Sequence, residues 1–198
     1  PDWAEQDPEV WWQNTVLAVQ KLMRQTQTGP GEIAAIGISY QMHGLVALDD
    51  RGTAVRPSII WCDSRAVATG DSAFRALGES YCLTHFPNSP GNFTASKLKW
   101  VKDNEPERFT RIRYAMLPGD YIAYRLSGEI RSTLPGLSEG ILWDFKENAP
   151  ARQLLDWYGI DPALIPPLAP TFGLQGQLTK PAADSLGLKP GVPITYRA

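Results

Sequence analysis

Residues 36–65 read IGISYQMHGLVALDDRGTAVRPSIIWCDSR. Three apolar runs of about strand length lie in and beside this stretch, at residues 33–40, 45–48 and 55–61. The turn residues Asp49-Asp50-Arg51-Gly52 separate the second run from the third and indicate a hairpin. We therefore predict three strands, with the rest of the chain packed around them.

Polar and aromatic residues follow the first and third runs directly. The residues after the first run are Gln41, Met42, His43 and Gly44, and those after the third are Trp61, Cys62, Asp63 and Arg65. Open α/β sheets usually bind ligands beyond the ends of their strands, so we expect a ligand site here. Asp63 and Arg65 are two residues apart and can either pair, which we favour, or reach a ligand. Cys62 fits a small buried filler better than a nucleophile.

The composition indicates a globular protein that binds small molecules. The chain has 198 residues, 43% of them hydrophobic and 10% aromatic, which is enough for one core or for two sub-lobes. A net charge of -2 gives no electrostatic basis for binding nucleic acid or an anionic membrane. No apolar run approaches the roughly twenty residues of a membrane helix, and the N-terminus does not resemble a signal peptide. With two cysteines and no zinc-like spacing, we expect a cytoplasmic protein without a metal site.

Alternating strand and helix patterns predict an α/β fold. Asp7-Pro8-Glu9 is typical of a helix start, and Thr94 and Asp120 are expected to cap later helices. The expected helices span 8–25, 65–77, 79–85, 94–104, 118–126, 151–158 and 181–186. Further strands are expected at 114–117 and 192–196, a hairpin at 173–178, and a loop at 86–92. Residues 130–145 are expected to form a strand, a corner and a second apolar run.

Four phrases of the sequence resemble the FGGY family of carbohydrate kinases, and within it most of all the xylulose kinases. They are QMHG after the GISYQ strand, WCDSR about twenty residues later, PGNFTASKLKWV followed by EPE, and LPGDYIAYRLSGE. Together with the segments between them they cover nearly the whole chain in order.

The resemblance implies a ribonuclease-H-like lobe of the actin and hexokinase type, with a mixed sheet flanked by helices. Residues 1–198 would form the N-terminal, sugar-binding lobe. The family's phosphate-approaching Asp-x-Gly-Thr or Asp-x-Gly-Ser hairpin would precede this chain, and its Gly-Asp step and ATP lobe would follow it. ATP and Mg²⁺ would thus serve the full-length protein without being bound fully by this part. The expected partners are a small-molecule sugar and the second lobe, with a homodimer as a possibility.

The resemblance also implies where the sugar would bind. Met42 and His43 fall on the family pair that lines the sugar pocket, where a histidine can donate to or accept from a hydroxyl. The alternative for His43 is a hydrogen-bonded histidine at a strand end. Gln41, Gly44, Trp61 and Asp63, with Asn88 and Asn92 in a loop over the pocket, are weaker candidates. Trp61 could equally face the core.

The general base is not obvious from the sequence. By the resemblance, an aspartate that takes the proton of the sugar hydroxyl is expected at Thr133, and threonine cannot act as a base near neutral pH. Glu139, six residues further on, could supply the base if its loop folds back. The alternative for Glu139 is a surface or helix-capping residue. Asp144 matches a structural aspartate of the family.

The sequence thus predicts the sugar-binding lobe of an ATP-dependent pentulose kinase that converts xylulose to xylulose 5-phosphate. Because of Thr133, a polyol-binding or regulatory module without phosphoryl transfer is the second hypothesis. A kinase for another sugar, such as ribulose, xylitol or glycerol, is the third.

Overall fold

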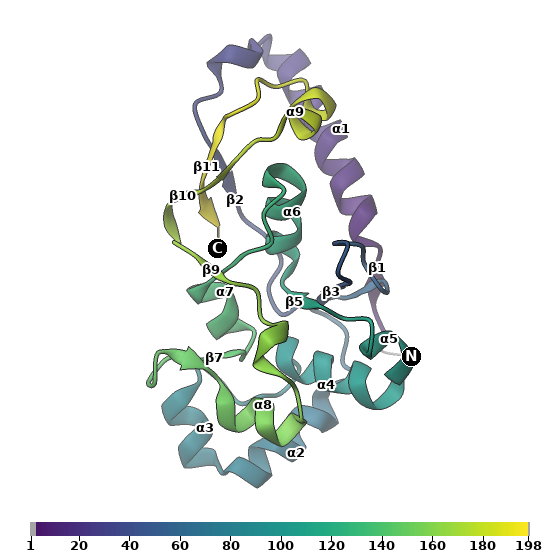
Figure 1. The fold of residues 1–198 in the computed structure, drawn as a ribbon, viewed down its shortest axis with the longest axis vertical. Helices are drawn as coiled ribbons and strands as arrows, with labels where there is room; N and C mark the ends of the chain where they lie inside the picture. Colours follow the sequence, from purple (N-terminus) through teal and green to yellow (C-terminus); the bar gives the residue numbers. More distant parts are fainter. Residues whose placement is uncertain (1–2, 198) are drawn as a thin grey trace.

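The computed structural model describes residues 3–197 (Figure 1). Its helices are α1 (Pro8–Thr26), η1 (Pro30–Glu32), α2 (Val67–Leu77), α3 (Glu79–His85), α4 (Thr94–Asn104), α5 (Pro106–Phe109), α6 (Pro118–Ser127), α7 (Leu134–Glu139), α8 (Arg152–Tyr158), η2 (Pro162–Leu164) and α9 (Lys180–Leu186). Its strands are β1 (Glu5–Gln6), β2 (Ile36–Ile38), β3 (Val46–Leu48), β4 (Ser58–Ile59), β5 (Tyr114–Met116), β6 (Ser132–Thr133), β7 (Trp143–Asp144), β8 (Ala149–Pro150), β9 (Leu168–Ala169), β10 (Phe172–Gln177) and β11 (Pro193–Arg197). None of these helices combines the length and the apolar character needed to cross a membrane.

The predicted mixed α/β architecture is confirmed. In the largest sheet β11 lies between β10, to which it is antiparallel, and β2, to which it is parallel. The remaining described strands form the pairs β1–β4, β3–β5, β6–β9 and β7–β8. Helices lie around these strands in the upper and lower parts of the molecule (Figure 1).

The first three predicted strands exist but are short, and they do not form one sheet. β2 pairs with β11, β3 with β5, and β4 with β1. A bridge between Leu45 and Ile59 connects the starts of β3 and β4. The separation from β2 arises in the turn before β3, where His43 has a φ of 61°. A left-handed residue ends the extended backbone, so β3 cannot continue alongside β2.

The pair β3–β5 separates two hydrophobic cores. Leu45 and Ala47 pack into the lower core with α2, α3, α4 and α8, whereas Val46 and Leu48 pack into the upper core with α1, α6 and α9. Side chains alternate between the two faces of a strand, so four consecutive apolar residues fill both cores. All four are at most 1% exposed. The turn at residues 40–44 is therefore attached to a strand that is fully buried on both faces.

The predicted helix starts are confirmed at α1 and α6 and corrected at α4. Asp7 accepts a hydrogen bond from the Glu9 N–H at 2.9 Å, as expected of an N-cap. The carboxylate of Asp120 accepts from the Leu117 N–H at 3.1 Å and so closes the first turn of α6. Thr94 is the first helical residue of α4 rather than its cap, since its hydroxyl donates to the Gly44 carbonyl at 3.2 Å.

The prediction for residues 130–145 missed α7. Thr133 is the N-cap of this helix and Pro135 lies in its first turn. A helix of six residues is too short to show an apolar period, so its sequence resembles a loop. The prediction that Cys62 is a buried filler was also wrong: Cys62 is exposed in the turn after β4, and Cys82 is the buried cysteine.

The loop before α4 packs directly against α2. A Cβ atom on Gly70 of α2 would lie 1.9 Å from the carbonyl oxygen of Gly91. The side-chain amide of Asn92 donates to the Asp63 carbonyl. The loop thus packs on α2 through the Gly91 backbone and is bonded to the segment after β4 through the Asn92 side chain.

Gly70→Ala should therefore destabilise the protein, although alanine normally favours a helix. We expect a loss of about 2 kcal/mol, because the methyl group can be accommodated only if the loop backbone moves. Urea unfolding measures the loss. Gly31→Ala is the matched control, since a Cβ there meets nothing within 4 Å. Equal effects of the two substitutions would contradict the packing of α2 on this loop.

Candidate functional site

The candidate site forms where the turn before β3 meets the end of α7. The backbone N–H of His43 donates to Oε1 of Glu139 at 3.0 Å, and the imidazole Nδ1 lies against the same oxygen. The two side chains are 27% and 24% exposed. Glu139 is thus neither a surface residue nor a helix cap, because α7 brings it back onto the predicted sugar-binding histidine.

The left-handed backbone of His43 is held by a lysine. Nζ of Lys97, in α4, donates to the His43 carbonyl at 2.8 Å. The imidazole packs edge-on against the Phe93 ring, with 4.4 Å between centroids. Backbone and ring of His43 are therefore both fixed by residues at the start of α4.

Lys97 is fully buried, which is unusual for a lysine. Burial lowers its pKa to about 8, while the nearby carboxylates of Asp63 and Glu139 favour the charged form. Sequence reasoning missed this residue. The available clue was a lysine on the helix face that also carries Thr94 and Val101, both of which are buried.

A cavity of about 140 Å³ is lined by Tyr40, Met42, Pro135, Gly136 and Glu139, whereas His43 contacts Glu139 from outside this lining. Oε2 of Glu139 is buried and accepts no hydrogen bond from the described chain. Met42 is 53% exposed and forms a soft, apolar wall. The arrangement suits a small polar molecule, since the lining combines a carboxylate residue with apolar walls.

Tyr40 is a second residue that sequence reasoning missed. It is the last residue of the first apolar run, where it could be mistaken for part of a strand. Burial, and then the negative charge of Asp120, raise its pKa above the ordinary value of a phenol. Tyr40 is therefore a neutral wall of the cavity at physiological pH.

Gly44, at the end of the turn, has a structural reason to be glycine. A Cβ atom there would lie 2.7 Å from Cγ of Pro118 at the start of α6. Gln41 is half-buried in the same turn. Neither residue is among those that line the cavity.

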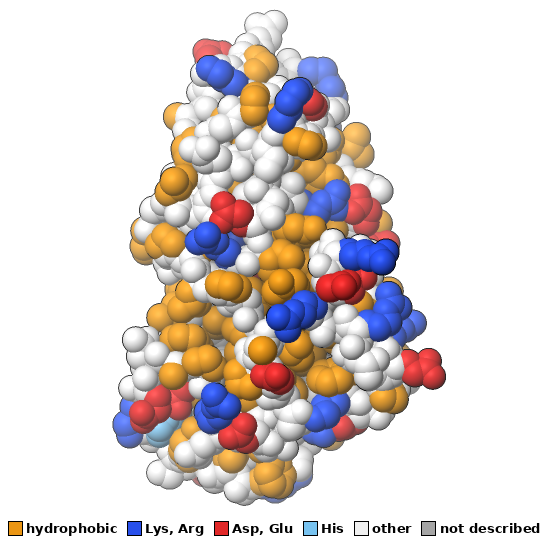
Figure 2. All heavy atoms as spheres, viewed as in Figure 1, with side chains coloured by type: hydrophobic (Ala, Val, Ile, Leu, Met, Phe, Trp, Pro, Cys, Tyr) orange, Lys and Arg blue, Asp and Glu red, His pale blue; other side chains and the backbone are white. Residues whose placement is uncertain are grey.

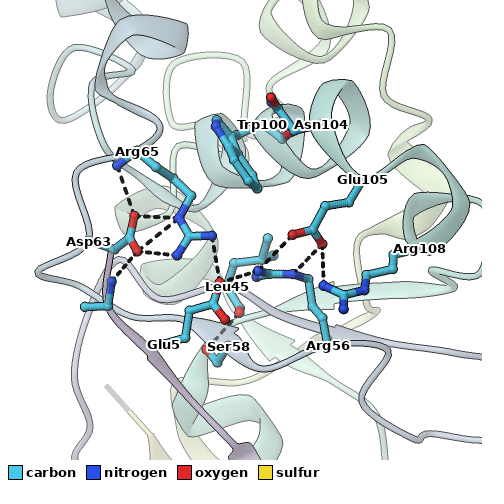
Figure 3. Close-up of polar contacts among 11 residues, drawn as sticks. Glu5, Leu45, Arg56, Ser58, Asp63, Arg65, Trp100, Asn104, Glu105 and Arg108 are labelled. Atoms are coloured by element: carbon cyan, nitrogen blue, oxygen red, sulfur yellow. Dashed lines mark hydrogen bonds and ion pairs between the residues drawn. The ribbon is translucent and has the colours of Figure 1, made fainter. Parts of the chain in front are cut away.

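Asp63 and Arg65 form the pair that the sequence favoured (Figure 3). Oδ1 of Asp63 accepts from Nε of Arg65 at 2.9 Å, and Oδ2 accepts from Nη2 at 2.6 Å. The Ala4 N–H also donates to Oδ2, at 2.5 Å. The Asp63 carboxylate is fully buried and directed at protein groups. Burial alone would raise its pKa, but these hydrogen bonds hold the pKa below its ordinary value.

A wider ion-pair network surrounds this pair (Figure 3). Glu5, of β1, binds both Arg65 and Arg56 at 2.6 Å, and Glu105 binds Nε of Arg56 at 2.8 Å. The guanidinium of Arg65 also lies 4.0 Å from the centre of the Trp3 ring. The network joins β1, the loop after β4 and the end of α4.

The remaining predicted residues lie outside the cavity lining. Trp61 is 57% exposed, so it does not belong to the core. Asn88 is exposed, and its side chain accepts from the adjacent Ser89 N–H at 2.8 Å. Asn92 is bonded to the Asp63 carbonyl, as described above. Their contact with a sugar remains a prediction.

Thr133, where the aspartate was expected, is fully buried, and its hydroxyl accepts from the Gly136 N–H at 3.4 Å. Asp144 accepts from the N–H groups of Lys146 and Glu147 and pairs with His85 at 2.7 Å. Both side chains thus serve the local fold. Within residues 3–197, no three His, Cys, Asp or Glu side chains are grouped so that they could bind a metal ion.

Comparison with known proteins identifies the family. The sequence profile described as "FGGY family of carbohydrate kinases, N-terminal domain" matches residues 1–198. The chain belongs to the FGGY family of carbohydrate kinases. It is 31% identical to the xylulose kinase of Staphylococcus xylosus over 187 residues, or 94% of this chain and 38% of that protein. It is 38% identical to the xylulose kinase of Escherichia coli over 143 residues, or 72% of this chain and 29% of that protein.

Solved structures of FGGY kinases share the fold. The xylulose kinase of Rhodospirillum rubrum superposes with a TM-score of 0.90 at 30% identity, covering 100% of this chain and 41% of that one. Glycerol kinase of Plasmodium falciparum, solved with ADP, superposes with a TM-score of 0.85 at 18% identity, which shows a common fold alone. These similarities confirm the predicted lobe of actin and hexokinase type. The chain spans about two fifths of the length of most relatives that it matches.

The network around Asp63 predicts an acid-sensitive contribution to stability. At pH 7, Asp63→Asn should cost about 3 kcal/mol, because it leaves buried guanidinium charge without its partner. The folded-state pKa of Asp63 lies below the ordinary 3.8, so its contribution is complete above that value and is lost as the pH falls through the folded-state pKa. The difference between wild type and variant should therefore shrink below pH about 4.

Urea unfolding at a series of pH values measures this difference. Asp71→Asn, an exposed aspartate of α2, is the control and should change stability little at any pH. A difference between wild type and Asp63→Asn that does not depend on pH would contradict the assignment.

Proposed function

We propose that this chain is the sugar-binding lobe of an ATP-dependent pentulose kinase that converts xylulose to xylulose 5-phosphate. The observation that carries the proposal is a cavity lined by Met42 and Glu139, together with a buried carboxylate oxygen of Glu139 that has no hydrogen-bond partner in the described chain. The relatives named xylulose kinases supply the substrate class.

The site residues have separate roles in this proposal. Oε2 of Glu139 accepts a hydrogen bond from a sugar hydroxyl, because the contacts from His43 fall on Oε1. The imidazole of His43 offers a second polar contact to the sugar. Met42 and Tyr40 exclude water from the carbon chain.

Phosphoryl transfer requires a hydroxyl that is held in line and loses its proton. Thr133 is buried as a helix cap and cannot take that proton. Within the described chain, Glu139 is the residue that we propose as the base, since it lines the cavity and its Oε2 has no hydrogen-bond partner there. The alternative is that Glu139 only positions His43. The two roles predict different values of kcat when Glu139 is replaced.

The candidate sugar cavity does not fit ATP. Its volume of about 140 Å³ is small for a nucleotide, and the sequence has no Gly-x-x-x-x-Gly-Lys loop. We therefore place the nucleotide on a second lobe in the remainder of the protein and assign no step through it to these residues. Magnesium ATP, when bound there, would supply the phosphoryl group.

Two observations support a second lobe. The relatives are much longer than this chain. Hydrophobic side chains also gather in the middle and lower left of one face, with charged side chains beside them on the right (Figure 2). In the same proposal, the first strands of this lobe precede residue 1.

Replacing the histidine should weaken sugar binding. We expect His43→Asn to raise the KM for xylulose about tenfold, the effect of losing one hydrogen bond to the sugar. Asparagine tolerates the left-handed backbone, so the turn should persist. Steady-state kinetics of the full-length protein measure the change. His85→Asn is the control, and equal KM values for the two variants would count against the site.

Glu139→Gln separates the two roles of the glutamate. If Glu139 is the base, kcat should fall by about 10² to 10⁴ with a smaller change in KM. If it only positions His43, the amide oxygen can still accept the hydrogen bond, so kcat should be nearly retained. A full kcat would therefore remove Glu139 from the chemical step.

A non-catalytic polyol-binding module is the second candidate, because the expected aspartate is replaced by Thr133. An assay of ADP release with xylulose, ribulose, xylitol and glycerol distinguishes the candidates. Release that depends on one polyol excludes the non-catalytic module and identifies the substrate. Binding of a polyol without ADP release would instead favour it.

A further inference from the structure

We propose that Lys97 is a positioning residue of the sugar site, whose ammonium group fixes the left-handed turn at His43 and so sets where His43 and Glu139 meet the sugar. This inference rests on the proposed function. In it, Lys97 acts through His43 and does not contact the sugar itself.

Lys97 lies next to the backbone of the turn that carries His43. Its side chain is fully buried, and Nζ donates to the carbonyl of His43 at 2.8 Å. His43 is one of the few non-glycine residues in the described chain with a positive φ. Such a backbone is unfavourable for a side chain of this size and persists only where its surroundings hold it. A charge-assisted bond to the carbonyl supplies that restraint.

The same helical turn also holds the other side of the site. The Thr94 hydroxyl donates to the Gly44 carbonyl at 3.2 Å, and the Ala95 N–H donates to the Gly140 carbonyl at 3.0 Å. Gly44 follows His43, and Gly140 follows Glu139. The first turn of α4 therefore sets the separation between the histidine and the glutamate, and Lys97 is its charged member.

Stability alone does not account for a lysine here. Within residues 3–197 its ammonium group donates a hydrogen bond to an uncharged carbonyl, and its charge is removed from water. A buried charge without a directly bonded counter-ion normally destabilises a fold, so an apolar residue of the same length should be tolerated at least as well. A role in positioning His43 explains why a charged side chain is present here although burying its charge is unfavourable.

The surroundings make the effect dependent on pH. Asp63, Cys62 and Arg65 face Lys97 from the loop after β4, and Glu139 and His43 face it from the site. Since burial lowers the pKa of Lys97 to about 8, the ammonium is charged at neutral pH and loses its proton just above it. The affinity for sugar should fall over that range.

Lys97→Met in the full-length protein tests the proposal, with Lys99→Met on the same helix as the matched control. Lys99 is paired with Asp103 toward solvent. Xylulose binding is measured by calorimetry and folding by the melting temperature. We expect Kd to rise about tenfold in Lys97→Met, as for a lost bond to a charged group, with an unchanged or higher melting temperature. Lys99→Met should behave as wild type.

A second measurement follows wild-type Kd from pH 7 to 9.5. We expect Kd to rise above pH about 8, and Cys62→Ser to leave the rise intact, which excludes the thiol as its source. An unchanged Kd in Lys97→Met, or equal losses in Lys97→Met and Lys99→Met, would overturn the proposal. If Lys97→Met does not fold, a flat pH profile of the wild type overturns it.

The two levels of the proposal fail differently. A wild-type protein that binds none of xylulose, ribulose, xylitol and glycerol overturns the proposed function, and the role of Lys97 falls with it. A wild type that binds one of them while Lys97→Met binds it equally well overturns the role of Lys97 alone.

Discussion

β3 is buried on both faces, and this constraint determines where the groups of the candidate site can lie. A strand that fills two cores at once cannot shift by one residue without exchanging the side chains of both. The turn at residues 40–44 enters this strand directly, so the position of His43 follows from the packing of four apolar residues. The position of the polar groups in this turn thus depends on the hydrophobic packing of β3.

Two charged groupings near the site differ in their relation to the cavity, although each contains a buried atom without a hydrogen-bond partner in residues 3–197, Nη1 of Arg56 in one and Oε2 of Glu139 in the other. The network of Glu5, Arg56, Asp63, Arg65 and Glu105 joins carboxylates to guanidinium groups and binds three segments together. The grouping of Lys97, His43 and Glu139 leaves one carboxylate oxygen without a protein partner, next to a cavity. Unpaired polar groups are costly when buried, so they are expected where a ligand will complete them.

Local and family patterns in the sequence predicted much of this arrangement. The start of α1 at Asp7 and the pairing of Asp63 with Arg65 were predictable, because the partners lie within a few residues. The resemblance to the family led to the prediction that Met42 and His43 line a sugar pocket. The contact between His43 and Glu139 joins residues 96 apart in the chain, and the brief helix that makes it gave no periodic pattern. Lys97 was missed for a related reason: its sequence environment shows an amphipathic helix, but only the packed structure shows that the lysine points inward.

The contact between Gly70 and Gly91 has a thermodynamic consequence for recognition. A segment already ordered by its own backbone loses little conformational entropy when a small molecule arrives. The part of residues 87–92 that faces a ligand is thus preorganised. The conformational entropy of this part is lost when the protein folds, not when the ligand binds. The free energy of association is then available for discriminating between hydroxyl patterns.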